Sequence, residues 1–512
     1  MNLLEQVRVH AQKAPDRVAL RCGDQVLAYG GFWLSVETVA VRLSQHGVRA
    51  GERVAWLGLN HPDQIILLLA LARLGAILVP LNYRLSNTEL KAILRHSGAR
   101  LAIADSTHLS IAISLSSFQI LESSSLSVPT NSVKTNEIGV PDLVSTSAYD
   151  GTNPLLLVYT SGTTGQAKGA LHTLQNLSAN CQIAIDLQDI TENDHVLTVL
   201  PMFHVGGLCI QTLPALYAGA SITLHQKFDA RHWLTDVQNL QPSLSLMVPA
   251  TLKAVIDHPQ FASSDLSSLR ALAAGSSTVP KHLIEPFHAR GVPVTQVYGA
   301  TETGPVSIGL NPSDSLSYVG SAGRPCTKVE VQLVDEQGTK VAEGEIGEIR
   351  LRGPNVMQGY WQDANNPAFQ NGWFQSGDLA RCDAAGFYWV VGRSKDMIIS
   401  GGENIYPAEI ENILSQSPRI AEVAVIGVPD ERWGEAVVAV VVPHQSQPPD
   451  TLAQSVLQER DVLQLLDGQL ARFKWPRRVL FRAALPKTVL GKVIKAELGQ
   501  TVLQVLALES TQ

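Results

Sequence analysis

Cysteine is scarce in this sequence, and its placement narrows the class of protein. Five cysteines occur in 512 residues, and none belongs to a Cys-x-x-Cys pair. They are Cys22, Cys181, Cys209, Cys326 and Cys382. An odd number of scattered cysteines argues against a disulfide framework or a structural zinc site. We therefore expect reduced thiols, which is typical of a cytoplasmic protein.

Long hydrophobic runs and a strong net charge are also absent. The longest apolar run, 65–72, is far short of the ~20 residues that cross a bilayer, and the N-terminus lacks the pattern of a secretion signal. The 46 acidic and 39 basic residues leave a net charge of −7, which gives no general attraction to nucleic acid or anionic lipid. We expect no nucleic-acid partner, no membrane span and a cytoplasmic location.

Strand-like and helix-like segments alternate along most of the chain, including a helix that Asn87 is expected to cap. This alternation predicts an α/β fold with parallel sheets, whereas 330–333 and 347–352 suggest an antiparallel part. After a charged junction at 393–396, the last ~115 residues have the size of a small separate domain. The main expected strands are 54–57, 77–80, 101–104, 196–200, 221–224, 245–248, 271–274 and 294–297.

A segment rich in glycine and hydroxyl residues follows a strand-like run at 154–158. It reads Thr160-Ser161-Gly162-Thr163-Thr164-Gly165-Gln166-Ala167-Lys168. Open backbone N–H groups and a terminal ammonium both favour an anionic phosphate chain. The segment is not a Walker loop, because Gly169 stands where that loop needs a magnesium-binding hydroxyl. It therefore predicts a site for a nucleoside triphosphate or a similar ligand.

Two further segments can complete a nucleotide site. The first reads Tyr298-Gly299-Ala300-Thr301-Glu302-Thr303 at the end of an expected strand. Its aromatic ring can stack on a base, and Glu302 can hold Mg²⁺, a cation that prefers oxygen ligands. The second contains Asp378, whose carboxylate can accept two hydrogen bonds from a ribose.

The last two segments supply cations near the expected domain junction and beyond it. Arg393 opens a stretch that continues through Lys395 to the glycine pair Gly401-Gly402. Some 90 residues later, Gly491 precedes Lys492 and would let a loop approach closely and present an ammonium.

Together, the five segments resemble, in order and spacing, the adenylate-forming superfamily of acyl-CoA synthetases, stand-alone adenylation domains and luciferases. The resemblance covers nearly the whole chain. It implies a large N-terminal domain, 1–394, of stacked and mainly parallel sheets flanked by helices, with a small β-barrel-like part. It also implies a small, mobile α+β C-terminal domain, 395–512, hinged near Lys395.

The resemblance further implies two half-reactions that use ATP, Mg²⁺ and coenzyme A. A carboxylate attacks the α-phosphorus of ATP and gives an acyl-adenylate and pyrophosphate; a thiol then attacks the acyl carbon and releases AMP. Because the nucleophile and the phosphate chain are both anionic, cations are needed where charge accumulates. The implied catalytic residues are Lys492, His204, Thr160, Glu302 and Lys168, with Thr160 and Glu302 at the metal.

The implied nucleotide contacts follow the same motifs. The segment 160–168 cradles the β- and γ-phosphates, and Lys492 bridges the carboxylate and the α-phosphate. Tyr298 and the turn at 275–276 flank adenine, while Asp378 and Arg393 hold the ribose. The full implied set is Thr160, Ser161, Gly162, Thr163, Thr164, Gly165, Lys168, Gly275, Ser276, Tyr298, Gly299, Ala300, Thr301, Glu302, Asp378, Arg393, Lys395, Gly401, Gly402, Glu403 and Lys492.

The thiol step needs a different surface. The resemblance implies that rotation about Lys395 withdraws Lys492 and brings in the segment 400–403. Gly401 and Gly402 would then leave room for the thin pantetheine arm of coenzyme A.

The acid is expected to bind beside His204, in the segment 201–207. The surrounding residues are apolar or small and include no lysine, arginine or aspartate that could pair a second substrate charge. This favours a hydrophobic monocarboxylic acid, and the glycines 206 and 207 favour an aliphatic acid of medium or long chain. The residues expected to surround the acid are Val205, Gly206, Leu208, Met247, Val248 and Ala274.

Other functions stay open from the sequence. An aryl acid–CoA ligase of the benzoate, cinnamate or succinylbenzoate type fits the same motifs, as does a stand-alone enzyme that loads a carrier protein. A silent nucleotide-binding protein is a more remote alternative. The acid, the acceptor, the pathway and the oligomeric state remain undetermined, with a homodimer as one option.

Overall fold

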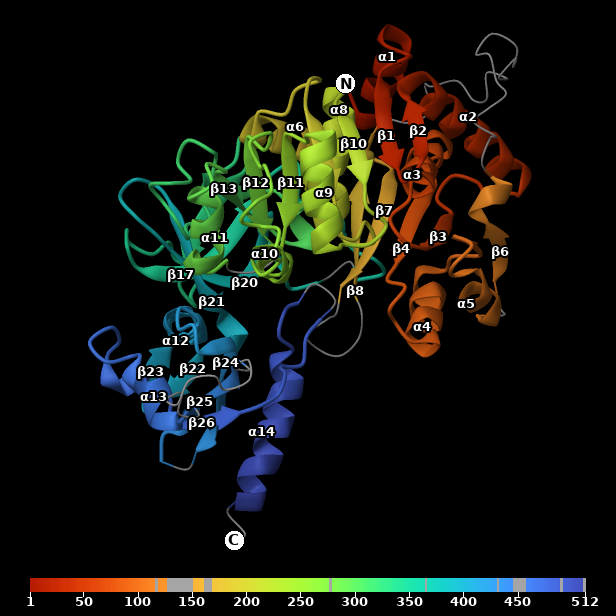
Figure 1. Ribbon diagram of the computed structural model, residues 1–512. Coiled ribbons are helices and arrows are strands. Elements are labelled where there is room, and N and C mark those ends of the chain that lie inside the picture. The colour runs from red at the N-terminus through yellow and green to blue at the C-terminus, as the bar shows by residue number, and fades with distance from the viewer. Residues whose placement is uncertain are drawn as a thin grey trace.

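The computed structural model describes most of the chain (Figure 1). The described residues are 1–115, 118–126, 151–160, 168–275, 279–363, 366–430, 432–444, 457–488 and 491–509. Six predicted site residues lie outside them, namely Ser161, Gly162, Thr163, Thr164, Gly165 and Ser276.

We call the part of the chain up to the short helix at 394–396 the larger body. A nine-stranded sheet forms its centre, in the order β15-β14-β13-β12-β11-β9-β10-β1-β2. The strands from β13 to β1 in this order are all parallel, and the outer strands pair antiparallel. Their bounds are β1 Val18–Cys22, β2 Gln25–Ala28, β9 His195–Thr198, β10 Ser221–Leu224, β11 Leu244–Met247, β12 Ala271–Gly275, β13 Val294–Tyr298, β14 Ile308–Gly309 and β15 Arg324–Pro325. The predicted parallel arrangement is confirmed.

A seven-stranded sheet has the order β18-β8-β7-β4-β3-β5-β6. Its bounds are β3 Arg53–Leu57, β4 Ile77–Leu81, β5 Leu101–Ala104, β6 Gln119–Glu122, β7 Pro154–Thr160, β8 Lys168–Thr173 and β18 Gly359–Tyr360. Helix α3 (Pro62–Leu74) is apolar around most of its circumference and contacts β4 and β7 of this sheet and β1 of the other. The helix can lie between two sheets because it has no polar face to keep in water.

The remaining helices of the larger body follow the expected alternation. They are α1 Leu3–Lys13, α2 Tyr29–Gln45, α4 Asn87–Ser97, α5 Leu109–Ser114, α6 Leu174–Gln188, α7 Val205–Gly207, α8 Leu213–Ala218, α9 Ala230–Leu240, α10 Pro249–Ile256 and α11 Lys281–His288. The short helices are η1 Ser123–Ser125, the π-helix η3 Leu208–Thr212 and η4 Thr301–Thr303.

The cap of α4 differs from the expectation by one residue. Ser86, not Asn87, is the N-cap, because its hydroxyl accepts from the Glu89 backbone N–H. The Glu89 carboxylate in turn accepts from the Ser86 N–H at 2.8 Å, which completes a capping box.

A third, antiparallel sheet joins the two larger ones to the C-terminal part. It contains β16 Glu330–Val334, β17 Ile346–Arg352, β19 Phe369–Gln370, β20 Trp373–Cys382 and β21 Tyr388–Arg393. The predicted antiparallel part is therefore present.

The C-terminal part, which we define as everything after the short helix η5 (Ser394–Asp396), has a sheet and apolar clusters of its own. In Figure 1 it lies in blue below the larger body, and its last helix, α14, packs on it through Leu498 and Val502 and runs down to the C-terminus. Its elements are β22 Ile398–Ser400, β23 Glu403–Ile405, α12 Pro407–Leu414, β24 Ile420–Asp430, β25 Gly434–Pro443, α13 Glu459–Gln464, η6 Arg472–Lys474, β26 Arg478–Phe481 and α14 Lys495–Glu509. The domain boundary at 394–395 stays a prediction.

Candidate active site

The carboxyl ends of the central parallel strands carry several of the predicted residues. β12 ends at Gly275 and the neighbouring β13 ends at Tyr298. A Cβ atom on Gly299 would overlap the carbonyl oxygen of Pro305, so the chain can make this turn only with glycine. The turn leads directly into η4, and Glu302 therefore lies close to the end of β13.

Tyr298, Asp378 and Arg393 meet in one cluster, although they are far apart in sequence. The Tyr298 hydroxyl donates to Asp378 Oδ2 at 2.8 Å, and Arg393 Nε lies 2.9 Å from Asp378 Oδ1. Asp378 and Arg393 face each other across β20 and β21. Burial, and next the negative charge of Asp378, raise the pKa of Tyr298 well above its ordinary value. The tyrosine therefore stays a neutral donor, and Asp378 stands where it can accept hydroxyl groups.

Glu302 and Lys168 meet at Tyr360, a residue that the sequence analysis missed. The Tyr360 hydroxyl donates to Glu302 Oε1 at 2.6 Å, and Lys168 Nζ lies 5.3 Å from the centre of the Tyr360 ring. Tyr360 reaches this place because β18 pairs with β8, where Tyr360 faces Ala170. Burial, followed by the charge of Glu302, raises the pKa of Tyr360. Its signal in the sequence was only a Gly-Tyr pair in a short strand.

Thr160 and Lys168 mark the two ends of the predicted phosphate loop. They are cross-strand partners in β7 and β8, and the Thr160 hydroxyl donates to the Lys168 carbonyl oxygen at 3.4 Å. Two strands that pair at the base of a loop hold its ends together. The joint role of Thr160 and Glu302 at a metal stays a prediction.

Three buried polar residues that the sequence analysis missed support the turn at 300–307 from behind. His172 Nε2 donates to the Thr301 carbonyl at 2.7 Å, and burial lowers the pKa of His172 to about 4. Asn355 Nδ2 donates to the Thr303 carbonyl at 2.6 Å. Asn180 donates to the Cys209 carbonyl at 2.7 Å and accepts from the backbone N–H of Val306 at 3.1 Å.

The Asn180 hydrogen bonds join two regions of the candidate site. Cys209 belongs to the π-helix η3, which follows the predicted acid-binding segment, and Val306 belongs to the turn beyond Glu302. Within the turn itself, the Ala300 backbone N–H donates to the Thr303 hydroxyl. The segments predicted for the nucleotide and for the acid are thus connected through one buried amide.

His204 stands at the start of α7, between β9 and η3. Its Nδ1 accepts from the Gly206 backbone N–H at 3.1 Å, which caps this short helix. Burial lowers the pKa of His204 to about 4, so the imidazole is neutral at neutral pH. Its predicted place beside the reacting carboxylate stays a prediction.

Lys492 belongs to a hairpin, which we define by its described ends, 487–488 and 491–493. Lys487 and Val493 form an antiparallel bridge, and the Thr488 backbone N–H donates to the Lys492 carbonyl at 2.7 Å. The Lys492 backbone N–H in turn donates to the Thr488 hydroxyl at 3.2 Å, and Gly491 has a φ of +78°. Bonds on both sides of the hairpin fix the direction in which the lysine leaves it.

The groups around Lys492 change the pKa of its ammonium group. Its side chain is exposed to solvent, and it lies near the Arg393, Asp378, Asp396 and Lys395 charges. The density of surrounding protein, and next the positive charge of Arg393, lower the pKa of Lys492 to about 8. Lys492 therefore faces the same cluster as Tyr298 and Asp378.

The residues predicted for the thiol step lie in η5 and in the first two strands of the C-terminal part with the turn between them. Lys395 is in η5, and Gly401 and Gly402 form the turn between β22 and β23, with positive φ values of 63° and 86°. The Gly401 backbone N–H donates to the Trp433 carbonyl at 2.8 Å, and Glu403 pairs with Ser400. Their predicted role at a pantetheine arm stays a prediction.

A second cluster with metal-binding side chains contains His225, His232 and Asp236. His225 Nε2 lies 2.8 Å from Asp236 Oδ2, and the two imidazole rings stack at 4.3 Å with 16° between their planes. Because in-plane lone pairs of stacked rings run nearly parallel, the rings cannot both point at one ion in this arrangement. The cluster is better described as a hydrogen-bonded pair with a stacked neighbour.

Comparisons with known proteins agree with this geometry. The sequence profile of the AMP-binding enzyme family matches residues 7–361, and the profile of the AMP-binding enzyme C-terminal domain matches residues 409–492. The chain belongs to the AMP-binding enzyme family. Within this adenylate-forming superfamily it falls in the branch of AMP-forming acyl-CoA synthetases.

Individual relatives of this AMP-binding enzyme cover essentially its whole length. The chain is 42% identical to the indoleacetate–CoA ligase of Aromatoleum aromaticum, with 100% of both chains covered. It is 39% identical to a feruloyl-CoA synthase of an Amycolatopsis species, with 95% of this chain and 96% of the relative covered. The solved structure of the Bacillus subtilis o-succinylbenzoate CoA synthetase with its acyl-adenylate intermediate is similar at a TM-score of 0.83 and 30% identity, covering 96% and 97%.

A helix that crosses a bilayer has to be both long and apolar. Within the described residues, no helix combines the length and the apolar character that a membrane crossing needs.

Proposed function

We propose that this AMP-binding enzyme joins an aromatic carboxylic acid to coenzyme A, using ATP and Mg²⁺ and passing through an acyl-adenylate. The observation that carries the proposal is the 42% identity, over the full length, to a ligase named for indoleacetate. A second relative is named for ferulate. In both acids a short linker joins the carboxylate to an aromatic ring, and we infer the same class of acid here.

The predicted acid-binding segments support an uncharged substrate body. Their members Val205, Leu208, Met247, Val248 and Ala274 are all buried and carry no ionisable group. A buried second charge on the substrate would need a partner, which these residues do not supply.

An aromatic pair next to His204 supports a ring-shaped substrate. Phe203 precedes His204 and makes an edge-to-face contact with Tyr83, with ring centres 5.5 Å apart. Tyr83 also lies 5.0 Å from the His108 ring. Aromatic groups prefer such edge contacts over stacked sandwiches, so this group can extend to a substrate ring.

The main argument for the expected aliphatic acid does not hold. It rested on space that glycines 206 and 207 were expected to leave. A Cβ atom on Gly207 would come within 2.5 Å of the Leu200 carbonyl oxygen, so backbone already occupies the space beside this glycine. Gly207 is required for close packing, and the aryl-acid alternative is the better supported one.

The proposed roles in adenylation follow from the charges around Lys492. The acid oxygen attacks the α-phosphorus, and the bond from that phosphorus to the pyrophosphate oxygen breaks. Lys492 would stabilise negative charge on the attacked phosphate, and Asp378 would accept the ribose hydroxyls. Glu302 and Thr160 offer oxygen ligands of the kind that Mg²⁺ prefers, while Lys168 supports the phosphate chain. The thiolate of coenzyme A then attacks the acyl carbon, and AMP leaves.

One panel of acids tests the proposal. The enzyme is incubated with ATP, Mg²⁺ and either indoleacetate, phenylacetate, ferulate or an aliphatic acid of the same carbon number as indoleacetate, with and without coenzyme A. Pyrophosphate release and thioester formation are measured separately. We expect aryl acids to give the higher kcat/KM by at least roughly tenfold, which is within the range that one pocket supplies.

Three results would contradict the proposal in different ways. Preference for the matched aliphatic acid would restore the fatty-acid assignment. Pyrophosphate release without thioester would identify an enzyme that loads another acceptor, such as a carrier protein. No release with any acid would favour a silent nucleotide-binding protein.

A further inference from the structure

At Gly491, the hairpin that carries Lys492 comes close to a small side chain of the larger body. A Cβ atom placed on Gly491 would lie 3.0 Å from the Cβ of Ala250, so the Gly491 backbone and the Ala250 methyl group are in van der Waals contact. Ala250 lies in the first turn of α10, which follows β11 at the carboxyl edge of the nine-stranded sheet. The contact therefore joins the C-terminal part to the edge that carries the candidate site.

Both partners in this contact are small residues. Gly491 adopts a φ of +78°, which side chains with a Cβ atom rarely adopt. Ala250 is exposed on the larger body, so the core beneath α10 does not limit the size of its side chain. The Gly491 backbone lies against one side of it.

A shift at Gly491 would be passed on to Lys492. The two residues are adjacent, and the hairpin is held by the Lys487–Val493 bridge and by the two hydrogen bonds between Thr488 and Lys492. A hairpin bonded in this way moves as a unit. Lys492 would then lose its place beside the Asp378 and Arg393 charges.

We propose that Ala250 is a positioning residue for acyl-adenylate formation, because its small side chain is the seat on which the Lys492 hairpin docks. Ala250 touches no reacting atom and acts only through Lys492. The inference rests on the proposed function, since it assumes that Lys492 serves the first half-reaction. It predicts a defect confined to that half-reaction.

The test compares an enlarged seat with a matched control. Ala250→Leu fills the contact, Ala250→Ser keeps it nearly unchanged, and Ala262→Leu adds the same side chain at another exposed alanine beyond α10. Pyrophosphate release with the best acid of the panel measures adenylation. Thioester formation from supplied acyl-adenylate measures the second half-reaction, which does not need Lys492 in this position.

We expect Ala250→Leu to slow adenylation by about 10²-fold, the usual cost of displacing a catalytic group by roughly 1 Å. Ala250→Ser and Ala262→Leu should stay within about twofold of the wild type, as most exposed substitutions do. Thioester formation from supplied adenylate should be unchanged in all three. Urea unfolding of each variant confirms that the fold is retained.

Two outcomes would overturn the inference. Adenylation by Ala250→Leu at the wild-type rate would show that the seat does not position Lys492. An equal loss of both half-reactions would show a general structural defect rather than a docking defect. The proposed function is judged separately on the wild type, because a preference for aliphatic acids would refute the aryl assignment and still allow the Ala250 comparison with the preferred acid.

Discussion

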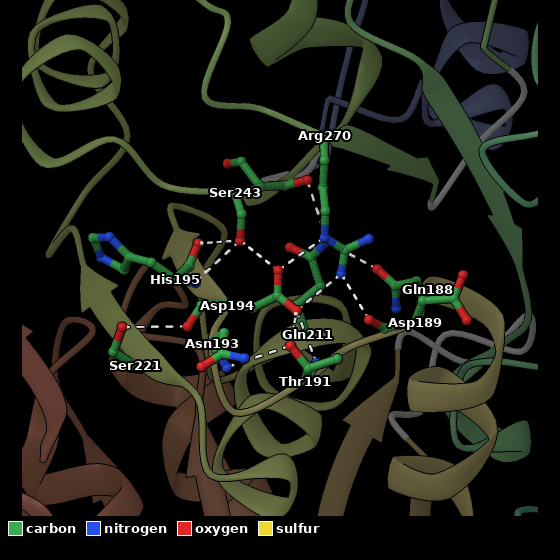
Figure 2. Close-up of polar contacts among 11 residues, drawn as sticks. Gln188, Asp189, Thr191, Asn193, Asp194, His195, Gln211, Ser221, Ser243 and Arg270 are labelled. Atoms are coloured by element: carbon green, nitrogen blue, oxygen red, sulfur yellow. Dashed lines mark hydrogen bonds and ion pairs between the residues drawn. The ribbon is translucent and has the colours of Figure 1, made fainter.

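The two edges of the nine-stranded sheet use polar groups in opposite ways. At the amino edge, where β9, β11 and β12 begin, Figure 2 shows Asp194 and Arg270 at the centre of a closed network. At the carboxyl edge, Asp378 and Arg393 form a similar pair beside the end of β13. Both pairs join an aspartate to an arginine, but their surroundings differ.

The amino-edge pair is saturated with internal partners. Arg270 donates to both oxygens of Asp194, at 2.8 and 3.0 Å, and the Ser243 hydroxyl adds a bond of 2.6 Å. The Thr191 backbone N–H contributes another at 2.8 Å. Burial alone would raise the pKa of Asp194, but these donors outweigh it and hold the pKa below its ordinary value.

The carboxyl-edge pair is satisfied more loosely. Asp378 has one bond from Tyr298 and one from Arg393, whereas Asp194 has five. The two arginine side chains are similarly exposed, at 37% for Arg393 and 33% for Arg270. Lys492, a third charge, stands next to the pair with a pKa of about 8. Groups that keep free capacity and meet solvent can exchange their partners for a ligand. We infer that the Asp–Arg pair serves stability at the amino edge, and we predict that the pair at the carboxyl edge binds a ligand.

The largest effect is expected from the removal of the cation at the carboxyl edge, Lys492. Lys492→Ala should slow adenylation by ~10²-fold or more, since comparable electrostatic groups contribute that much to a transition state. Thioester formation from supplied acyl-adenylate should remain, and stability should be unchanged because the Lys492 side chain is exposed. Pyrophosphate release and thioester formation, measured separately, check this.

Lys487→Ala is the matched control for this prediction, because Lys487 belongs to the same hairpin and pairs with Glu422 at 2.7 Å instead. It should keep most of the adenylation activity. If Lys492→Ala lost both half-reactions together, the assignment of Lys492 to the first of them would be wrong.

The second prediction compares two single variants, in which either Asp194 or Asp378 is replaced by asparagine. Asp194→Asn should lower the free energy of unfolding by about 3 kcal/mol, because it leaves Arg270 partly buried without its charge partner. Asp378→Asn should instead raise the KM for ATP by roughly tenfold, the weight of one hydrogen bond to a charged group, with a smaller loss of stability. Urea unfolding and ATP titration of both variants make the comparison.

A KM for ATP that rises as much in Asp194→Asn as in Asp378→Asn would refute the division between the two edges. So would a larger loss of stability in the variant at 378.

The third prediction concerns acid. Burial holds the pKa of His172 at about 4, below the ordinary value of about 6.5, so between these values the unfolded chain binds more protons than the folded one. The contribution of neutral His172 is therefore full above about pH 6.5 and is lost as the pH falls towards 4, by up to about 3 kcal/mol. The stabilisation from the hydrogen bonds of Asp194 should persist until the Asp194 carboxylate is protonated, below about pH 4.

Urea unfolding of wild type and His172→Gln between neutral pH and pH 4 checks this order. The variant should lose less stability than the wild type over that range. Equal pH dependence in the two proteins would show that His172 does not contribute to the acid sensitivity.

The parts of the fold that the sequence predicted are those set by local pattern. Most parallel strands between β3 and β13 were expected within one or two residues, because short apolar runs between helices define them. The parallel strands β1 and β6 were not among those expected. Tyr298, Asp378 and Arg393 were found because each stands in a motif at a strand or turn.

The parts that were missed depend on contacts between distant segments. Tyr360 is brought to Glu302 only by the pairing of β18 with β8. His172 and Asn180 bind backbone atoms of loops more than a hundred residues away, so nothing in their own neighbourhood marks them. The close packing of Gly207 against Leu200 was likewise hidden, and it changed the interpretation of the acid pocket.

The smallest expected effect tests whether Tyr360 belongs with the loosely satisfied groups. Tyr360→Phe removes the hydroxyl that donates to Glu302 at 2.6 Å and keeps the ring below Lys168. The loss of orientation at Glu302 should weaken Mg²⁺-dependent adenylation by roughly fivefold, equivalent to about 1 kcal/mol for one hydrogen bond. Tyr318→Phe, which removes a tyrosine hydroxyl from a ring stacked on Phe387, is the control. The Mg²⁺ concentration at half-maximal pyrophosphate release is the measurement; if it is the same in both variants and the wild type, Tyr360 contributes packing alone and Glu302 does not depend on it.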